Sequence, residues 1–144
     1  MPSITINTTV DIAASQDAVW RVLTDFTSYD VWNPSFRIEG TPEVGAKLVV
    51  HLKDGMTFRP KVLAATPGKE FRWLGKLGFR GIVAGEHFFL LTSNGDGTTR
   101  LQHGERFSGV LVSLAKGSAG KGAAGYEAFS QALKQRVEQL NHTG

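Results

Sequence analysis

Apolar and polar residues alternate along most of the chain up to residue 108, and short runs of turn residues separate the alternating segments. A period of two places successive side chains on opposite faces of a sheet, so this alternation predicts strands. Glycine, proline, asparagine and aspartate connect the last six segments closely, which predicts an antiparallel meander. The predicted strands are residues 3–12, 35–40, 46–53, 57–66, 69–77, 82–93 and 98–108.

Two regions have a helical period instead. Ser15 is suited to cap a helix that ends near Asp25, and Pro34 ends a single further turn. The second region runs from about Ala123 to Asn141, and its apolar residues recur at spacings of three and four. They form one stripe that we expect to be buried against the sheet: Tyr126, Phe129, Leu133, Val137 and Leu140.

The stretch before this helix contains many glycines. Five of them lie between residues 109 and 125, and each interior glycine costs a helix about 1 kcal/mol relative to alanine. This stretch is therefore either a loosened first part of the helix or a flexible gate.

The order of elements is one strand, two short helices, six strands and a long helix, or β-α-α-β-β-β-β-β-β-α. This order is typical of the α+β class, and 144 residues fit one domain, residues 1–144. Helices that cover one face of an antiparallel sheet leave a concave side, which either side chains or a ligand can fill. The pattern leaves both alternatives open.

Charge and composition exclude several classes of function. Sixteen Lys and Arg against thirteen Asp and Glu give a net charge of +3, and the basic residues are scattered, so we expect no nucleic-acid partner. The absence of cysteine excludes disulfides and thiolate chemistry. No apolar run approaches the ~20 residues that cross a bilayer, and the N-terminus lacks the features of a secretory signal. We expect no membrane insertion and a cytoplasmic location.

Several strings in the sequence resemble the START-like superfamily, also called SRPBCC, of polyketide cyclase/dehydrase and lipid-transport proteins. The resemblance covers essentially the whole chain. The strings that carry it are Ala18–Phe26, Trp32–Pro34, Phe71–Gly75, Glu86–Leu91, Gly97–Gly109 and the last helix.

The resemblance implies a helix-grip fold, in which a seven-stranded curved antiparallel sheet surrounds the C-terminal helix and encloses a cavity. Access to this cavity would lie near residues 75–81 and 109–125. Members of the superfamily include ligand carriers, hormone receptors, aromatases, cyclases and co-chaperone-like domains, so the fold alone does not decide the activity.

Three titratable residues are the candidates for chemistry. In the last strand His103 and Glu105 share a face with apolar neighbours, which predicts that they point inward. The resemblance places His87 on the inward face of the preceding strand. A histidine beside a carboxylate in an apolar chamber can transfer protons as a catalytic acid or base, or it can simply orient a ligand. Glu86 and Arg106 are expected on the outer face, where they could pair.

A metal site is the other interpretation of these three residues, because two histidines and a glutamate are common metal ligands. Such a site needs three donors at about 2 Å from one point, which residue types alone do not provide, so we predict no metal ligand and no cofactor.

Apolar and aromatic residues with the same inward parity, together with two on the last helix and one on the rim, are the predicted ligand contacts. They are Trp32, Phe58, Val62, Phe71, Trp73, Phe89, Leu101, Phe107, Tyr126 and Phe129.

Three functions are compatible with the predicted fold and cavity. The first is binding of a hydrophobic or aromatic small molecule of the lipid, polyketide or terpenoid type by a monomer or homodimer. The second is a cofactor-independent cyclase, dehydratase or isomerase that uses the cavity His and Glu residues. The third is a protein-interaction module of the co-chaperone type, for which no sequence stretch supplies a large exposed patch.

Overall fold

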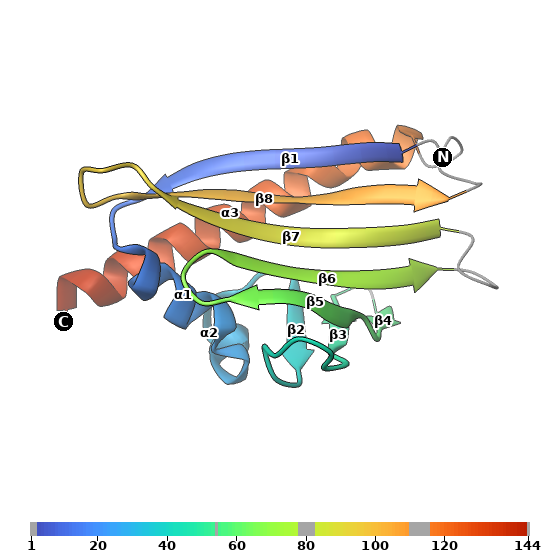
Figure 1. Ribbon diagram of the computed structural model, residues 1–144, viewed down its shortest axis with the longest axis horizontal. Coiled ribbons are helices and arrows are strands. Elements are labelled where there is room, and N and C mark those ends of the chain that lie inside the picture. The colour runs from blue at the N-terminus through green and yellow to red at the C-terminus, as the bar shows by residue number, and fades with distance from the viewer. Residues whose placement is uncertain (1–2, 54, 78–82, 110–115, 144) are drawn as a thin grey trace.

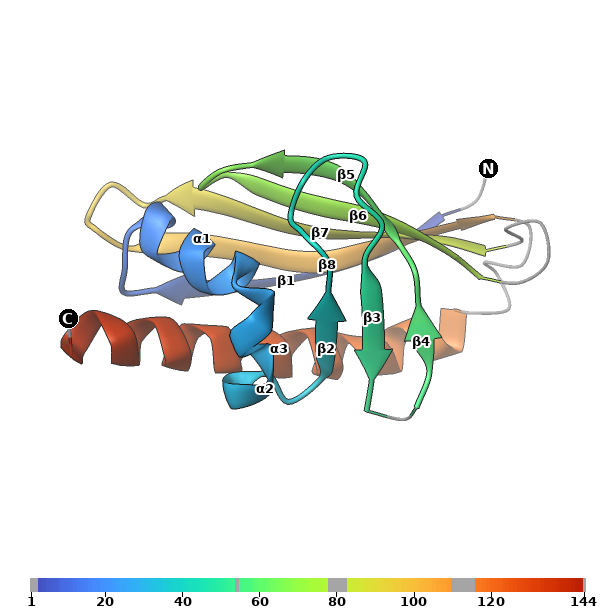
Figure 2. The ribbon, with the colours of Figure 1, turned by 90° about the horizontal axis from the view of Figure 1, so that it is seen from below.

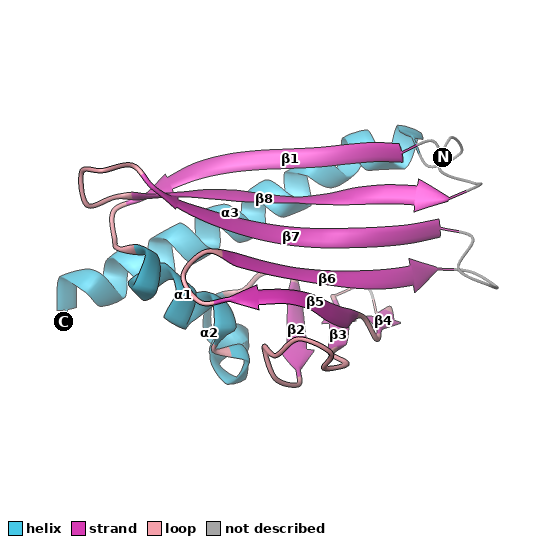
Figure 3. Cartoon of the chain, viewed as in Figure 1, coloured by secondary structure: helices cyan, strands magenta, loops and turns pink. Residues whose placement is uncertain are grey.

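The computed structural model of the chain describes residues 3–53, 55–77, 83–109 and 116–143. A five-stranded antiparallel sheet is covered on one face by the long C-terminal helix α3 (Lys116–Thr143), by shorter helices and by a three-stranded sheet (Figure 1, Figure 2). The helices all lie on that same face of the large sheet (Figure 2, Figure 3). This arrangement confirms the predicted α+β class and the helix-grip fold.

The large sheet brings the first and last strands of the chain together. Its order is β1-β8-β7-β6-β5, and every neighbouring pair is antiparallel. Gly95 and Gly97, in the turn between β7 and β8, have φ angles of 85° and 89°, which glycine adopts without a steric cost. The strands are β1 (Ser3–Ile12), β5 (Lys61–Thr66), β6 (Glu70–Leu77), β7 (Val83–Ser93) and β8 (Thr99–Gly109).

The smaller sheet corrects the predicted strand count. The segment 57–66 contains two strands, because Pro60 has no N–H group to donate and interrupts the ladder. The described residues therefore form eight strands in two sheets, and a single bridge between Lys47 and Lys61 joins the sheets. The strands of the smaller sheet are β2 (Phe36–Glu39), β3 (Val49–Leu52) and β4 (Thr57–Phe58).

The short helices connect β1 to β2. Helix α1 (Gln16–Thr24) is capped as predicted, since the Ser15 side chain accepts a hydrogen bond from Ala18 N at 3.2 Å. A 3₁₀ turn, η1 (Phe26–Ser28), and one turn of helix, α2 (Tyr29–Trp32), follow. Asn33 is extended before Pro34, and its side-chain oxygen accepts a hydrogen bond from Ser35 N at 2.8 Å. The chain thereby turns directly into β2.

Helix α3 begins seven residues before the predicted start at Ala123, so the glycine-rich stretch from residue 116 is helical; residues 110–115 lie outside the described residues. Phe129, Leu133 and Val137 are buried as expected. Leu140 is 42% exposed, which corrects its place in the buried stripe. It lies at a surface groove between α1 and α3 and not against the large sheet. In the described part of the chain, no helix is long and apolar enough to cross a membrane.

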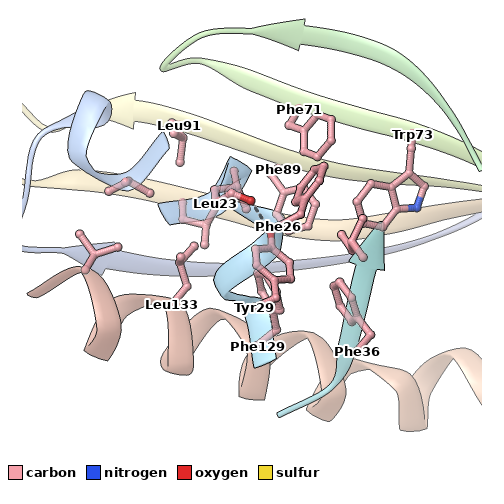
Figure 4. Packing of buried hydrophobic residues seen from close by; sticks show 14 of the residues in the cluster. Leu23, Phe26, Tyr29, Phe36, Phe71, Trp73, Phe89, Leu91, Phe129 and Leu133 are labelled. Atoms are coloured by element: carbon pink, nitrogen blue, oxygen red, sulfur yellow. Dashed lines mark hydrogen bonds between the residues drawn. The ribbon is translucent and has the colours of Figure 1, made fainter. Parts of the chain in front are cut away.

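Aromatic rings pack between α3 and the large sheet (Figure 4). Phe129 of α3 stacks on Phe36 of β2 with ring centroids 5.3 Å apart. Phe89 of β7 lies 5.5 Å from Phe129 and 6.0 Å from Phe71 of β6. The Tyr29 hydroxyl donates to the carbonyl of Leu23, so this buried polar group has a partner. One continuous cluster therefore joins the helix and both sheets.

The outer face of the large sheet carries an ion-pair network. Arg72 donates to Glu70 at 2.8 Å and to Glu86 at 3.0 Å, and its guanidinium lies over the Phe88 ring. Glu86 is opposite Arg106 in the register, but its carboxylate binds Arg72 on the neighbouring strand. The expected pair of Glu86 with Arg106 is thus replaced by a diagonal pair, which long side chains can reach.

We predict that Leu133→Ala and Leu140→Ala have unequal effects on stability. Leu133 is fully buried, so its truncation should lower the free energy of unfolding by about 2–5 kcal/mol. Leu140 is largely exposed, so the same truncation there should cost less than about 1 kcal/mol. Urea denaturation followed by circular dichroism measures both values. Equal losses would contradict the described orientation of α3.

Candidate functional site

A cavity of about 330 Å³ lies between the concave face of the large sheet, the small sheet and α3. Most of its wall is apolar, and six aromatic side chains contribute to it. A polar group of three side chains, His87, His103 and Glu105, forms one part of the wall. The lining residues are Ser35, Phe36, Val50, Leu52, Phe58, Pro60, Trp73, Gly75, Gly85, His87, His103, Glu105, Phe107, Gly125, Tyr126 and Phe129.

The register of β7 and β8 brings the three titratable side chains together. His87 is opposite Glu105, and His103 is opposite Phe89, which is two residues from His87 on the same face. His87 and His103 are buried, and the Glu105 side chain is 18% exposed. Two neighbouring strands with a period of two therefore place all three groups on one wall of the cavity.

Hydrogen bonds connect these groups in a chain that ends on α3. His87 Nε2 lies 2.7 Å from His103 Nε2, and His87 Nδ1 lies 3.2 Å from Glu105 Oε1. The Tyr126 hydroxyl donates to the same Glu105 oxygen. At the other end, His103 Nδ1 lies 3.2 Å from the carbonyl of Tyr126 and 3.1 Å from Ser130 Oγ. Tyr126 is thus bonded to both ends of the chain.

The partners of the ring nitrogens allow two arrangements of the protons, because the Tyr126 carbonyl only accepts whereas the Ser130 hydroxyl can also donate. With a proton on His103 Nδ1, His103 Nε2 accepts from His87 Nε2–H. With Ser130 donating to His103 Nδ1, His103 Nε2–H donates to His87 Nε2 instead. His87 Nδ1 faces a carboxylate oxygen and carries a proton in both arrangements. All four ring nitrogens therefore have a hydrogen-bond partner in either case.

The surroundings shift the pKa values of His103, Glu105 and Tyr126. Burial lowers the pKa of His103 well below the ordinary 6.5, and the charge of His87 lowers it further. Burial raises the pKa of Glu105, but the hydrogen bonds from His87 and Tyr126 and the charge of His87 outweigh burial, so this pKa lies below its ordinary value. Burial and the Glu105 carboxylate together raise the pKa of Tyr126.

Gly85 makes room for the Glu105 carboxylate. A Cβ atom at Gly85 would lie 2.2 Å from Glu105 Oε2, which is much closer than two nonbonded atoms approach. Any side chain at this position would displace the carboxylate. Gly75 and Gly125 also line the cavity, and a Cβ atom at Gly125 would meet no atom within 4 Å. Parts of the two predicted access segments, residues 78–81 and 110–115, lie outside the described residues.

The structure brings eight of the thirteen predicted site residues to the cavity wall. They are the three titratable residues together with Phe58, Trp73, Phe107, Tyr126 and Phe129. Four others lie in the packed core behind the wall: Val62, Phe71, Phe89 and Leu101. Trp32 packs against Phe129 and Tyr29 and lines the separate groove between α1 and α3, so it does not form the rim of the cavity.

Apart from Phe58 of β4, the prediction omitted the residues that the small sheet and its flanking segments contribute to the cavity. Phe36, Val50 and Leu52 line it, together with Ser35 and Pro60. The alternation of Val50 and Leu52 with His51 marked an inward face, and His51 indeed bonds to Glu39 on the other side of β3. The sequence did not indicate that this short sheet packs over the concave face of the large sheet and closes one side of the cavity. The lining glycines could not be predicted from the sequence, because a glycine between strands usually indicates a turn and not a wall of a cavity.

Metal binding finds no support in the described residues, among which no group of three or more His, Asp or Glu is arranged to hold an ion. His87 Nε2 and His103 Nε2 bond directly to each other, so neither has a lone pair directed at a common open point.

We predict that His103→Gln changes the pH dependence of stability. Because the pKa of His103 is lowered in the folded state, below pH 6.5 the unfolded chain binds a proton that the folded chain does not. The free energy of unfolding of the wild type should therefore fall as the pH decreases from 6.5. In the variant this slope should be smaller by up to about 1.4 kcal/mol per pH unit, which is the contribution of one proton.

Urea titrations at several pH values between 5 and 7.5 measure these slopes. Gln102→Ala, at the adjacent outward position, serves as the control because it removes no titratable group. Identical slopes for the wild type and His103→Gln would show that His103 is not held neutral.

Comparison with known proteins agrees with this architecture. The profile of the family described as polyketide cyclase / dehydrase and lipid transport matches residues 3–138. A comparison with curated protein sequences gave no match. Three solved structures illustrate the similarity in fold.

A START superfamily protein from Mycobacterium smegmatis has 22% identity and a TM-score of 0.72, over 94% of this chain and 98% of that one. The Zhui aromatase/cyclase from Streptomyces sp. R1128 has 17% identity and a TM-score of 0.76, over 96% and 95%. Norcoclaurine synthase from Thalictrum flavum, in complex with dopamine and hydroxybenzaldehyde, has 15% identity and a TM-score of 0.73, over 96% and 88%. With the family profile spanning nearly the whole sequence, the chain belongs to the polyketide cyclase / dehydrase and lipid transport family.

Proposed function

We propose that this protein binds a compact, mainly apolar aromatic molecule in the cavity between the sheets and α3. The observation that carries the proposal is an aromatic-walled cavity of about 330 Å³ with one concentrated polar group. Ligand sites are typically concave, mostly apolar and equipped with a few polar groups that fix orientation. The family description, which includes lipid transport and cyclisation, is compatible with a ligand of this kind.

The size of the cavity narrows the ligand class. Sites for drug-sized molecules measure roughly 300–1,000 Å³, and this cavity is at the lower end of that range. A molecule of two or three fused rings suits it better than a lipid with two acyl chains. Flat rings also suit the wall, where Trp73, Phe36 and Phe107 offer aromatic surface. Norcoclaurine synthase, which has the same fold, is solved with two single-ring aromatic ligands.

We predict that Gly125→Leu weakens binding of 2-naphthol by at least about tenfold, or ~1.4 kcal/mol. Gly125 lines the cavity, and a Cβ atom there meets no other atom within 4 Å, so we expect a leucine side chain to take up part of the ligand volume. The matched control is Ala124→Leu, an exposed neighbour in the same helix that does not line the cavity. Isothermal titration calorimetry measures the affinities.

Equal affinities of the two leucine variants would place the binding elsewhere on the surface. Native mass spectrometry of the purified protein, followed by solvent extraction, provides an independent test, because a retained molecule should be released as a single small aromatic species. A protein without a retained molecule that also fails to bind 2-naphthol would contradict the proposal.

A second candidate function is proton transfer on such a ligand, without a cofactor. It is favoured by the hydrogen-bonded chain of Glu105, His87 and His103 at the cavity wall. The Glu105 carboxylate can remove a proton next to a carbonyl group, which leaves a neutral carboxylic acid and an enolate, and His87 holds the carboxyl group in place. Enclosure of the substrate would add a contribution from positioning.

We predict that, if this second function is present, the protein accelerates deuterium exchange at the enolisable carbon of 6-hydroxy-2-tetralone. Glu105→Gln removes the base and keeps the shape, so it should slow the exchange by about 100-fold or more. Proton NMR in D₂O measures the rate, and Glu70→Gln on the outer face is the matched control. Exchange at the same rate with and without the protein would exclude this function for such substrates.

A further inference from the structure

We propose that the cavity selects aromatic ligands that carry a hydrogen-bond donor, such as a hydroxyl or amine, and that Glu105 Oε2 accepts this bond. Ligands whose only polar atoms are acceptors, such as ketones, quinones and ethers, are disfavoured. This inference rests on the proposed binding function and specifies the chemistry of its ligand.

The first step is that the polar wall uses all of its own donors. The ring nitrogens of His87 bond to Glu105 and to His103. The other ring nitrogen of His103 bonds to α3, and the Tyr126 hydroxyl bonds to Glu105. The N–H and O–H groups of His87, His103 and Tyr126 therefore all donate to protein atoms, and none is left to donate to a ligand.

The second step is that one acceptor remains. Both bonds to the Glu105 carboxylate go to Oε1, so among the described residues Oε2 has no hydrogen-bond partner. Oε2 is also accessible. Among the described side chains, the nitrogen and oxygen atoms that are both buried and without a partner are Trp32 Nε1 and Asn33 Nδ2, and Glu105 Oε2 is not one of them. It occupies the space that a side chain at position 85 would fill, and both residues line the cavity.

The third step concerns the energy of the two kinds of ligand. A hydroxyl placed at Oε2 forms a hydrogen bond to a charged acceptor inside apolar walls, and such bonds are roughly twice as strong as neutral ones. A carbonyl or ether oxygen at the same place would face a carboxylate oxygen with no proton between them. Ser35 is the other polar side chain in the described wall, and its hydroxyl can donate or accept. It therefore does not discriminate between the two kinds of ligand.

Two matched probes test the inference: 2-naphthol, which has a donor, and 2-methoxynaphthalene, in which a methyl group replaces the hydroxyl proton. Apolar burial alone would favour the methyl ether, because it has the larger apolar surface. We expect the opposite order, with 2-naphthol bound at least about tenfold more tightly by the wild type. Isothermal titration calorimetry at pH 7, where the naphthol is neutral, gives both affinities.

Glu105→Gln should reduce this ratio to about threefold or less, because the glutamine amide offers donors as well as an acceptor. Glu70→Gln, on the outer face of the sheet, should keep the wild-type ratio. A ratio near one in the wild type would overturn the donor requirement and leave the proposed binding function in place. An unchanged ratio in Glu105→Gln would overturn the role of Glu105, and the absence of saturable binding of both probes would overturn the binding function itself.

Discussion

The site depends on one constraint, the register between β7 and β8. This pairing sets His87 opposite Glu105 and Phe89 opposite His103, so one face of two adjacent strands holds both the aromatic packing and the titratable groups. A shift of either strand by one residue would turn the side chains of that strand to the outer face. The tight turn at Gly95 and Gly97 fixes the register at one end of the hairpin. The large sheet thus provides the wall and the chemistry of the cavity at the same time.

The polar chain is compatible with an apolar core because its members satisfy one another. A buried imidazole or carboxylate without a partner would cost the fold several kcal/mol, whereas a charged pair with complete hydrogen bonding costs much less. His103 meets this condition only through α3, which supplies the Tyr126 carbonyl and Ser130. Docking of the helix and stabilisation of the polar wall are therefore parts of the same process.

The sequence allowed the fold to be predicted more completely than the site. Alternation and helical spacing are local signals, so they were enough for the strands, the cap at Ser15 and the buried face of α3. The split at Pro60 follows from a local signal that the alternation masked, the missing N–H group of proline. The exposure of Leu140 depends on where α1 and α3 meet, which no local period encodes. Strand parity separated inward from outward residues, but it does not measure depth. For that reason Phe71 and Phe89 were predicted as ligand contacts, although they lie in the core behind the wall.

The contact between Gly85 and Glu105 has a consequence for how this sequence can vary. Because the carboxylate occupies the space of the absent side chain, the two positions on neighbouring strands behave as one unit. A larger residue at 85 requires the Glu105 carboxylate to move from its present place or a shorter side chain at 105. The absence of a side chain at one strand position thereby specifies where the charge lies in the pocket.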